Sequence, residues 1–263
     1  MALSPFVFIG IGGSGGKTLR VVHDVLSNAL TTIGWDGEWP QAWQFLHIEV
    51  AANPDGIEPG LPFTLPLSDF QPLTTPGSTY RALDRRVNQT NRDGMDNYLA
   101  WNSWRPYPPE NVPVTISLGA GQYRAVGSVA VLNGLEEVGN RVNLALSRAM
   151  SADTSELERI QELWGSEDLG AENVLRNPSV IVVASLSGGS GSGALLDVCD
   201  VVRSHRPSEL TNVTAVVYAP EVFEDSQGDL EPGIAPNTFV ALNELLNASW
   251  VRGAENLPLS REV

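Results

Sequence analysis

The feature that most restricts the fold of this 263-residue chain is a run of seven small residues between an apolar strand and a helix. The run is Ser-Gly-Gly-Ser-Gly-Ser-Gly at 187–193, with an apolar segment at 180–184 before it and a helical pattern at 194–202 after it. A simple connection needs only about two or three residues, and ordering glycines costs backbone entropy. A flexible linker is the alternative, but the apolar segments on both sides argue against it. The run therefore indicates a loop whose bare backbone must approach something closely.

A second glycine cluster follows the first apolar segment in the same way. Residues 6–9 predict a strand, 10–18 read Gly-Ile-Gly-Gly-Ser-Gly-Gly-Lys-Thr, and the apolar spacing beyond predicts a helix. Bare amides at a helix N-terminus bind phosphate, and Lys17 and Thr18 add a charge and a hydroxyl. Ile11 stands where the Walker pattern needs glycine, whereas Gly10, Gly12 and Gly15 satisfy the G-x-G-x-x-G pattern of dinucleotide sites. A tight turn that binds nothing is the alternative.

Strands and helices alternate along the rest of the chain. We predict further strands at 43–50, 114–118 and 213–218, helices at 125–150, 155–164 and 236–246, and helical patches near 78–87 and 93–101. This order indicates the α/β class, with a three-layer, Rossmann-like, mostly parallel sheet. We expect residues 1–263 to form one nucleotide-binding domain with an ordered insertion at about 51–113, a region rich in proline and aromatic residues.

Charge and cysteine usage exclude several classes of function. The chain has 31 acidic and 16 basic residues and a net charge of -15, so a phosphate backbone or an anionic membrane would be repelled. We expect neither a nucleic acid nor a membrane as partner. The single cysteine, Cys199, cannot form an intramolecular disulfide, and no apolar stretch reaches the ~18 residues that span a bilayer. These features favour a cytoplasmic protein.

The glycine-rich motifs resemble those of the tubulin and FtsZ superfamily of GTP-binding proteins, and within it the bacterial proteins described as tubulin-like. The run at 187–193 is similar to the tubulin signature Gly-Gly-Gly-Thr-Gly-Ser-Gly, with Ser190 where the family usually has Thr. The run at 10–16 is similar to Gly-Val-Gly-Gly-Ala-Gly-Gly of FtsZ, which has Asn in the place of Lys17. Gly-Ala-Gly-Gln-Tyr-Arg at 119–124 stands in the place of the γ-phosphate loop.

The resemblance implies GTP or GDP with Mg²⁺ as cofactors and assigns roles to individual residues. The α- and β-phosphates would be wrapped by Gly188, Gly189, Ser190, Gly191, Ser192 and Gly193, and contacted from the other side by Gly12, Gly13 and Ser14. Lys17 is a further candidate phosphate contact through its own charge rather than through the resemblance. The γ-phosphate would be sensed by Ala120, Gly121 and Gln122. Glu49 would lie near the magnesium through a bound water, and Asn237 would contact the guanine nucleoside. A solvated strand end is the alternative for Glu49, and a helix N-cap is the alternative for Asn237.

The resemblance also implies assembly into a homo-oligomer or filament. In that family an acidic residue on a loop after the long core helix completes hydrolysis between subunits. That helix and the second domain would follow position 250, and the chain ends at Val263. We therefore expect the nucleotide-binding domain alone, without the second domain, and GTPase activity only if a neighbouring subunit or another region supplies the acid.

Two other functions fit the same motifs. A Rossmann-type NAD(P)-dependent oxidoreductase would need an acidic residue about 20 positions beyond the glycine loop to hold a ribose. Glu49, the nearest acidic residue at a strand end, lies 34 positions after Gly15. The other alternative is a non-hydrolysing assembly module that uses nucleotide as a structural switch.

Overall fold

The core of the protein is a five-stranded sheet in which every strand runs parallel to its neighbours, in the order β3-β2-β1-β4-β5. The computed structural model describes residues 3–62, 64–90, 106, 108–112, 115–165, 177–205, 212–223 and 233–250, without the side chains of 90 and 247–250. The strands are β1 (Phe6–Ile11), β2 (Trp43–Glu49), β3 (Phe70–Pro72), β4 (Ser179–Ser185) and β5 (Asn212–Tyr218). The predicted α/β class with a Rossmann-like parallel sheet is confirmed.

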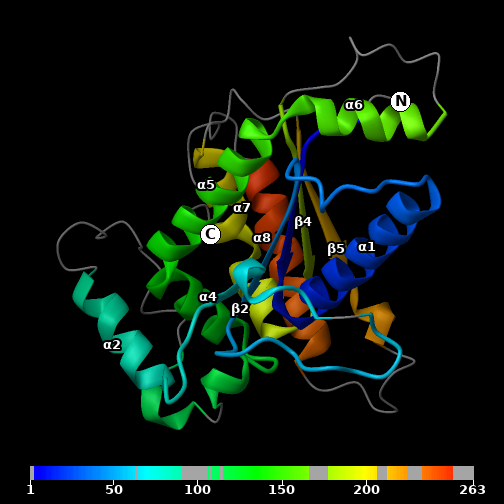
Figure 1. Cartoon of the computed structure of the whole chain (residues 1–263). Helices are drawn as coiled ribbons and strands as arrows, with labels where there is room; N and C mark the ends of the chain where they lie inside the picture. The colour runs from blue at the N-terminus through cyan, green and yellow to red at the C-terminus, as the bar shows by residue number, and fades with distance from the viewer. Residues whose placement is uncertain are drawn as a thin grey trace.

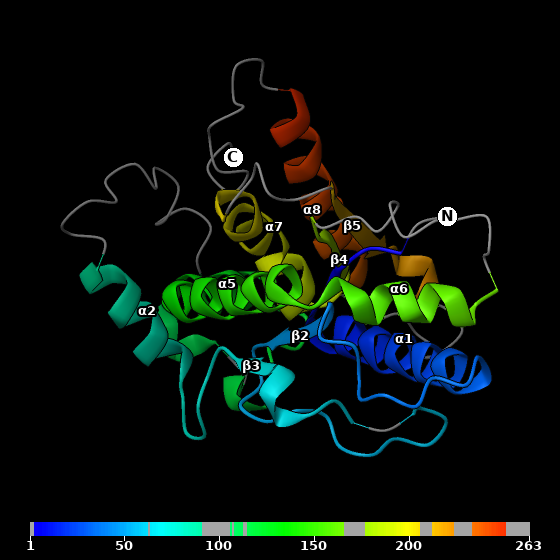
Figure 2. The ribbon, with the colours of Figure 1, turned by 45° about the horizontal axis from the view of Figure 1, so that its top comes forward.

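Helices cover both faces of this sheet (Figure 1). Helix α1 (Gly12–Thr32) packs on one face, against β1, β2 and β4. The opposite layer contains α4 (Arg124–Asn133), α5 (Leu135–Ser151) and α7 (Gly189–Ser204), with α2 (Tyr80–Thr90) against α4 and α8 (Ile234–Trp250) against α7. Helix α6 (Thr154–Leu163) lies beside α1 in Figure 2, near the amino ends of β1 and β2.

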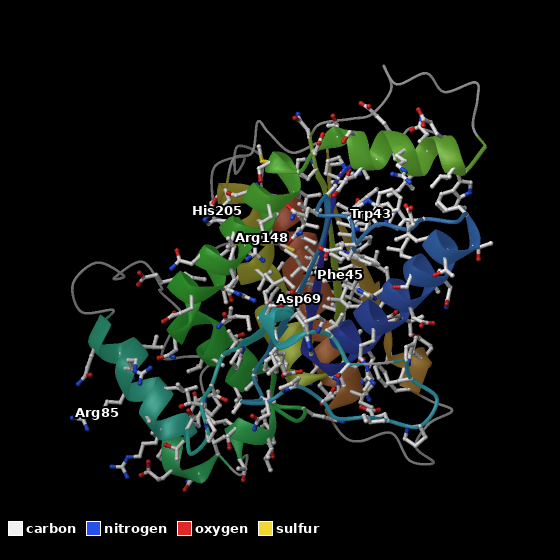
Figure 3. All side chains as sticks on the ribbon, in the orientation of Figure 1. Trp43, Phe45, Asp69, Arg85, Arg148 and His205 are labelled. Atoms are coloured by element: carbon white, nitrogen blue, oxygen red, sulfur yellow. The ribbon has the colours of Figure 1, made fainter. Side chains whose placement is uncertain are left out.

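The central strands are apolar because both of their faces are covered. Val7, Ile9, Val180 and Val182 are fully buried in β1 and β4. On the face of the sheet that α1 covers, aromatic side chains form part of the core. Phe45 stacks on Phe8 there, with 5.1 Å between ring centroids. Figure 3 shows Phe45 and Trp43 inside the fold on this side of the sheet.

The strand predicted at 114–118 is wrong in the part that the structure describes. Ile116–Leu118 is a single 3₁₀ turn, closed by hydrogen bonds from Leu118 N to Thr115 O and from Gly119 N to Ile116 O. The edge of the sheet beside β2 is taken instead by β3, which lies within the segment expected to be an insertion. In a strand, Ile116 and Leu118 would lie on the same face of the sheet. Ile116 is buried but Leu118 is 82% exposed, so the alternating apolar residues do not form one buried face.

The single helix predicted at 125–150 is two helices, α4 and α5, which meet at Gly134. Asn133-Gly134 is a dipeptide typical of turns, and Glu136 and Glu137 in the first turn of α5 suit the positive end of a new helix. The helical patch predicted at 93–101 lies outside the described residues. Among the described helices, none combines the length and apolar character that a membrane crossing needs.

Helix α1 begins directly at the end of β1, and glycines make this junction possible. A Cβ atom on Gly15 would lie 2.6 Å from the carbonyl oxygen of Val183 and 2.8 Å from the carbonyl carbon of Gly10. One turn of helix, one strand end and the neighbouring strand therefore touch through backbone atoms.

We predict that Gly15→Ala destabilises the fold, because its methyl group has no space beside the backbone of β1 and β4. Overpacking of this kind costs about 1–3 kcal/mol, which chemical denaturation can measure. Gly13→Ala is the matched control in the same turn of α1, since its nearest neighbour would be Asp55 Oδ2 at 3.8 Å. Stability of Gly15→Ala equal to that of Gly13→Ala would contradict the packing described.

Candidate functional site

The two glycine runs meet at the carboxyl edge of the sheet. Strands β1 and β4 are parallel neighbours with Ile11 opposite Ala184, so the loops that follow them lie side by side. A Cβ on Gly12, whose φ is +74°, would lie 2.9 Å from the backbone nitrogen of Gly191. A Cβ on Gly191 would lie 2.6 Å from the carbonyl oxygen of Ser185. Both positions therefore need glycine for close backbone contact.

A cavity of about 330 Å³ opens where these loops meet. Most residues predicted for the site line it: Gly12, Gly13, Ser14, Lys17, Glu49, Ala120, Gly121, Gly188, Gly189, Ser190 and Gly191. The lining also includes Ile11, Ala51, Asp55, Leu118, Gly119 and Ser185, which the sequence did not single out as ligand contacts. Ser14 and Ser190 face the same cavity, as a shared ligand would require.

The loop after the 3₁₀ turn forms the third wall of the cavity. Gly119 and Gly121 adopt positive φ values of 124° and 55°, which other residues rarely take. The N–H of Gly189 donates to the carbonyl oxygen of Gly121 at 2.7 Å and joins this loop to the start of α7. Three segments that are distant in the sequence are thus held together by their main chains.

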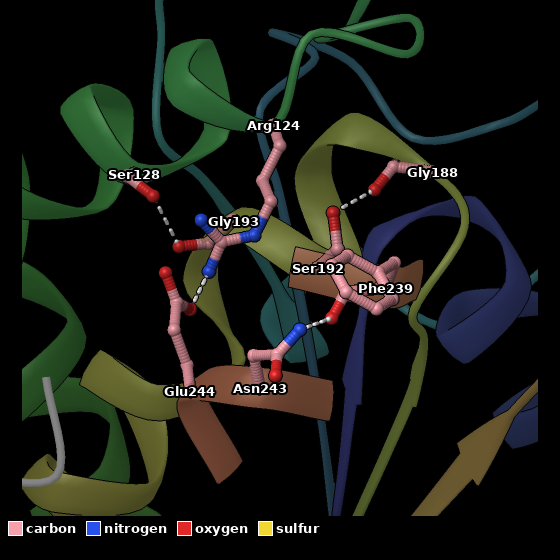
Figure 4. A network of polar contacts seen from close by, with 8 residues as sticks. All are labelled: Arg124, Ser128, Gly188, Ser192, Gly193, Phe239, Asn243 and Glu244. Carbon is pink, nitrogen blue, oxygen red and sulfur yellow. Dashed lines mark hydrogen bonds and ion pairs between the residues drawn. The ribbon is translucent and has the colours of Figure 1, made fainter. Parts of the chain in front are cut away.

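Two residues predicted for the phosphate loop, Ser192 and Gly193, are not among the residues that line the cavity. They lie within the first turn of α7, where the hydroxyl of Ser192 donates back to the carbonyl oxygen of Gly188. Gly193 packs against α4, and its carbonyl oxygen accepts a hydrogen bond from Ser128 Oγ at 2.7 Å (Figure 4). Ser192 therefore closes the start of α7 itself, whereas Gly193 joins α7 to α4.

Gln122 and Asn237, predicted to contact the γ-phosphate and the nucleoside, are not among the residues that line the cavity either; they connect α8 to the loops. Asn237 Nδ2 donates to the carbonyl oxygens of Gln122 at 2.8 Å and Ser187 at 2.9 Å. The side-chain oxygen of Gln122 accepts from the N–H of Gly233 at 2.8 Å. The Asn237 amide therefore binds two loops from the first turn of α8.

Glu49 is the last residue of β2 and lines the cavity. It is only 7% exposed, and its Oε1 accepts hydrogen bonds from Ser190 Oγ and Val50 N, both at 2.6 Å. Burial raises the pKa of Glu49, and these hydrogen bonds oppose that rise. The negative charge of Asp55 raises the pKa of Glu49 further, so the two carboxylates interact.

Asp55 is the charged residue among the cavity-lining residues that sequence reasoning missed. It belongs to Asn-Pro-Asp-Gly at 53–56, a pattern typical of turns, which gave no sign of a ligand role. The turn is held against α1 by the buried guanidinium of Arg20, which donates to the carbonyl oxygens of Gly56 and Pro62. Asp55 is thereby placed at the cavity.

The basic residues near the site have partners within the chain. Lys17 Nζ lies 2.9 Å from Glu58 Oε2, and both side chains are partly exposed. Arg124, at the start of α4, pairs with Glu244 of α8 (Figure 4). Lys17 is the one of these two that lines the cavity.

We predict that Glu49→Gln stabilises the ligand-free protein at neutral pH. Because the folded state raises the pKa of Glu49 above its ordinary value, stability falls as the pH rises through that interval and the buried carboxylate ionises. Glutamine retains an acceptor for Ser190 and Val50 and carries no charge. Denaturation at several pH values should show a gain at pH 7 that shrinks towards pH 4, and an equal gain at every pH would contradict this account.

The comparisons with known proteins identify a family. Neither the curated proteins nor the solved structures contain a match to this chain. A family model described as "Tubulin like" matches residues 7–258, which include β2 to β5, all of β1 except Phe6, and every loop of the cavity. The chain therefore belongs to the tubulin-like family.

Proposed function

We propose that this domain binds GTP or GDP, together with Mg²⁺, in the cavity formed by the three loops. The convergence of three bare main-chain segments on one cavity carries this proposal. Membership of the tubulin-like family supports it independently. Among the predicted contacts, those of the three loops that line the cavity are the ones we assign to the phosphates, and Glu49 is assigned to the Mg²⁺.

The phosphates are held by backbone amides rather than by side chains. Helices α1 and α7 both begin at the cavity, at Gly12 and Gly189. A helix N-terminus offers unpaired N–H groups and a partial positive charge, which together favour a phosphate. Gly121 and Ala120 bring further amides from the third wall, where the γ-phosphate would lie.

Glu49 and Asp55 are the residues that fit Mg²⁺. This ion takes oxygen ligands and is usually held by about one or two carboxylates together with phosphates and waters. Within the described residues no group of three or more His, Cys, Asp or Glu side chains is placed to hold a metal alone. The two carboxylates therefore suit an ion that arrives with a phosphate ligand. When bound, Mg²⁺ would neutralise charge on the phosphoryl group.

The orientation of Glu49 disfavours the NAD(P) alternative. A ribose-binding acid must present free carboxylate oxygens to two hydroxyl groups. Glu49 is instead buried and directed towards Ser190 of the phosphate loop. The second glycine run also has a role in a polyphosphate site that it lacks in an oxidoreductase.

Thermal melting with added nucleotides tests the proposal. A ligand at about 100 times its Kd stabilises the native state by about 2.7 kcal/mol, which corresponds to a rise in Tm of about 5–10 °C for a domain of this size. We expect GTP and GDP with Mg²⁺ to give such a rise. A rise with ATP or NAD but none with either guanine nucleotide would contradict the assignment.

Gly188→Val supplies the matched variant for this measurement. Gly188 lines the cavity in extended backbone geometry, with φ −82° and ψ 159°, and no atom lies within 4 Å of its Cβ position. Valine is compatible with that backbone and would project into the open cavity. We expect the nucleotide-dependent rise to disappear while the unliganded Tm stays close to that of the wild type.

We further propose that nucleotide binding is coupled to self-assembly and that hydrolysis needs an acidic residue from a neighbouring copy. Catalysis would then consist of positioning and electrostatic stabilisation of a phosphoryl group attacked by water. We predict that the protein sediments with GTP more than with GDP and that phosphate release rises steeply with protein concentration. Release at a constant rate per molecule across dilutions would place hydrolysis within one chain, and sedimentation without release would indicate a non-hydrolysing switch.

A further inference from the structure

The first turn of α1 is held on its carbonyl side by a histidine of β2. The side chain of His47 is buried, and its Nε2 lies 3.1 Å from the carbonyl oxygen of Gly12, the first residue of α1. A carbonyl oxygen only accepts hydrogen bonds, so Nε2 carries the hydrogen and donates it. Gly12 lines the cavity, whereas His47 is not among the lining residues. His47 therefore reaches the cavity through Gly12.

The imidazole ring of His47 has little room to move. A Cβ on Gly16 would lie 2.2 Å from its Cε1 and 2.4 Å from its Nε2, so the ring lies directly against the backbone of α1. Phe70 of β3 makes a T-shaped contact with the same ring, with 5.3 Å between ring centroids. Packed between a helix backbone and an aromatic ring, His47 is a rigid support for the start of α1.

A support on the carbonyl side leaves the amides of this turn free. The N-cap residue of α1 is Ile11, and no side chain caps the helix there. A side-chain cap would occupy N–H groups that a phosphate needs. Gly12 has a φ of +74°, and glycine is the residue with the most backbone freedom to lose. The hydrogen bond from His47 restrains Gly12 without using any of these N–H groups.

We propose that His47 is a positioning residue of the nucleotide site, which holds Gly12, Gly13 and Ser14 with their N–H groups ready for the phosphates. This inference rests on the proposed function. A loop that is already ordered in its binding conformation loses less freedom when the ligand arrives, so its affinity is higher. Loss of the hydrogen bond should therefore weaken nucleotide binding even in a protein that stays folded.

Equilibrium binding of GDP with Mg²⁺ to a matched pair of variants tests this role. Glutamine at position 47 keeps an N–H donor near the place of Nε2, whereas methionine has nearly the same length and no donor. We expect His47→Met to bind GDP about fivefold or more weakly than the wild type, the effect of one lost hydrogen bond. We expect His47→Gln to recover most of that loss. Titration calorimetry below the Tm of each variant measures the affinities.

Gln161→Met is the matched control for the loss of a buried hydrogen bond. Gln161 of α6 is buried near the amino ends of β1 and β2, and its Oε1 accepts from the N–H of Leu3 at 3.3 Å. We expect this variant to melt at a lower temperature and to bind GDP as the wild type does. Equal losses of affinity in His47→Met and Gln161→Met would overturn the inference, as would His47→Gln that binds as weakly as His47→Met.

A measurement on the wild type does not depend on whether the variants fold. NMR spectra of ¹⁵N-labelled histidine side chains should show the hydrogen of His47 on Nε2, and a hydrogen on Nδ1 alone would overturn the inference. Wild-type affinity for GDP in His47→Met would also overturn it while leaving nucleotide binding intact. A wild-type protein that melts cooperatively but binds neither GDP nor GTP would overturn the proposed function itself.

Discussion

Gly12 and Gly191 bring the ends of β1 and β4 together through backbone atoms alone, and the cavity exists because of that contact. The parallel pairing of the two strands fixes where their loops begin, and the missing side chains allow the loops to touch. The same contact aligns the N-termini of α1 and α7 on one space. A larger residue at either position would separate the two helix ends that open on this cavity.

The long apolar strands and their glycine loops could be predicted from the sequence because local pattern and tertiary environment agree there. The edge strand β3 could not be predicted, since Phe70-Gln71-Pro72 is too short and too poor in β-favouring residues to give a signal. It is a strand because it lies beside β2, next to the hydrogen bond from Leu73 N to Glu49 O. Tertiary contact, rather than local sequence, therefore determines which segment forms this edge strand. The alternating apolar residues at 114–118 are misleading for the same reason, because a strand-like pattern does not form a strand without a strand partner.

Within the run at 187–193, the sequence does not distinguish a glycine that faces a ligand from one that packs. Gly188 has open space at its Cβ position, whereas a Cβ on Gly189 would lie 2.9 Å from Gly121 O. Close packing therefore requires glycine at 189, whereas a side chain at 188 would fit the backbone and extend into open space. Asp55 went unrecognised because turn residues carry no sign of what they face. The hydrogen bonds of Arg20 to Gly56 and Pro62, together with the bond from Ala52 N to Ser117 O, bring that turn to the cavity.

Helix α8 is fastened to the site at two places on the same side of the helix. Asn237 binds the carbonyl oxygens of Gln122 and Ser187, and Glu244, seven residues later, pairs with Arg124 at the start of α4. A spacing of seven residues returns to the same helix face after about two turns, so both attachments resist the same displacement. Because Gln122 and Arg124 flank the end of the third cavity wall, movement of that wall must either carry α8 with it or break contacts that are largely buried. The third cavity wall and α8 are therefore expected to move together. Helix α8 also exposes apolar side chains such as Phe239 on its outer surface.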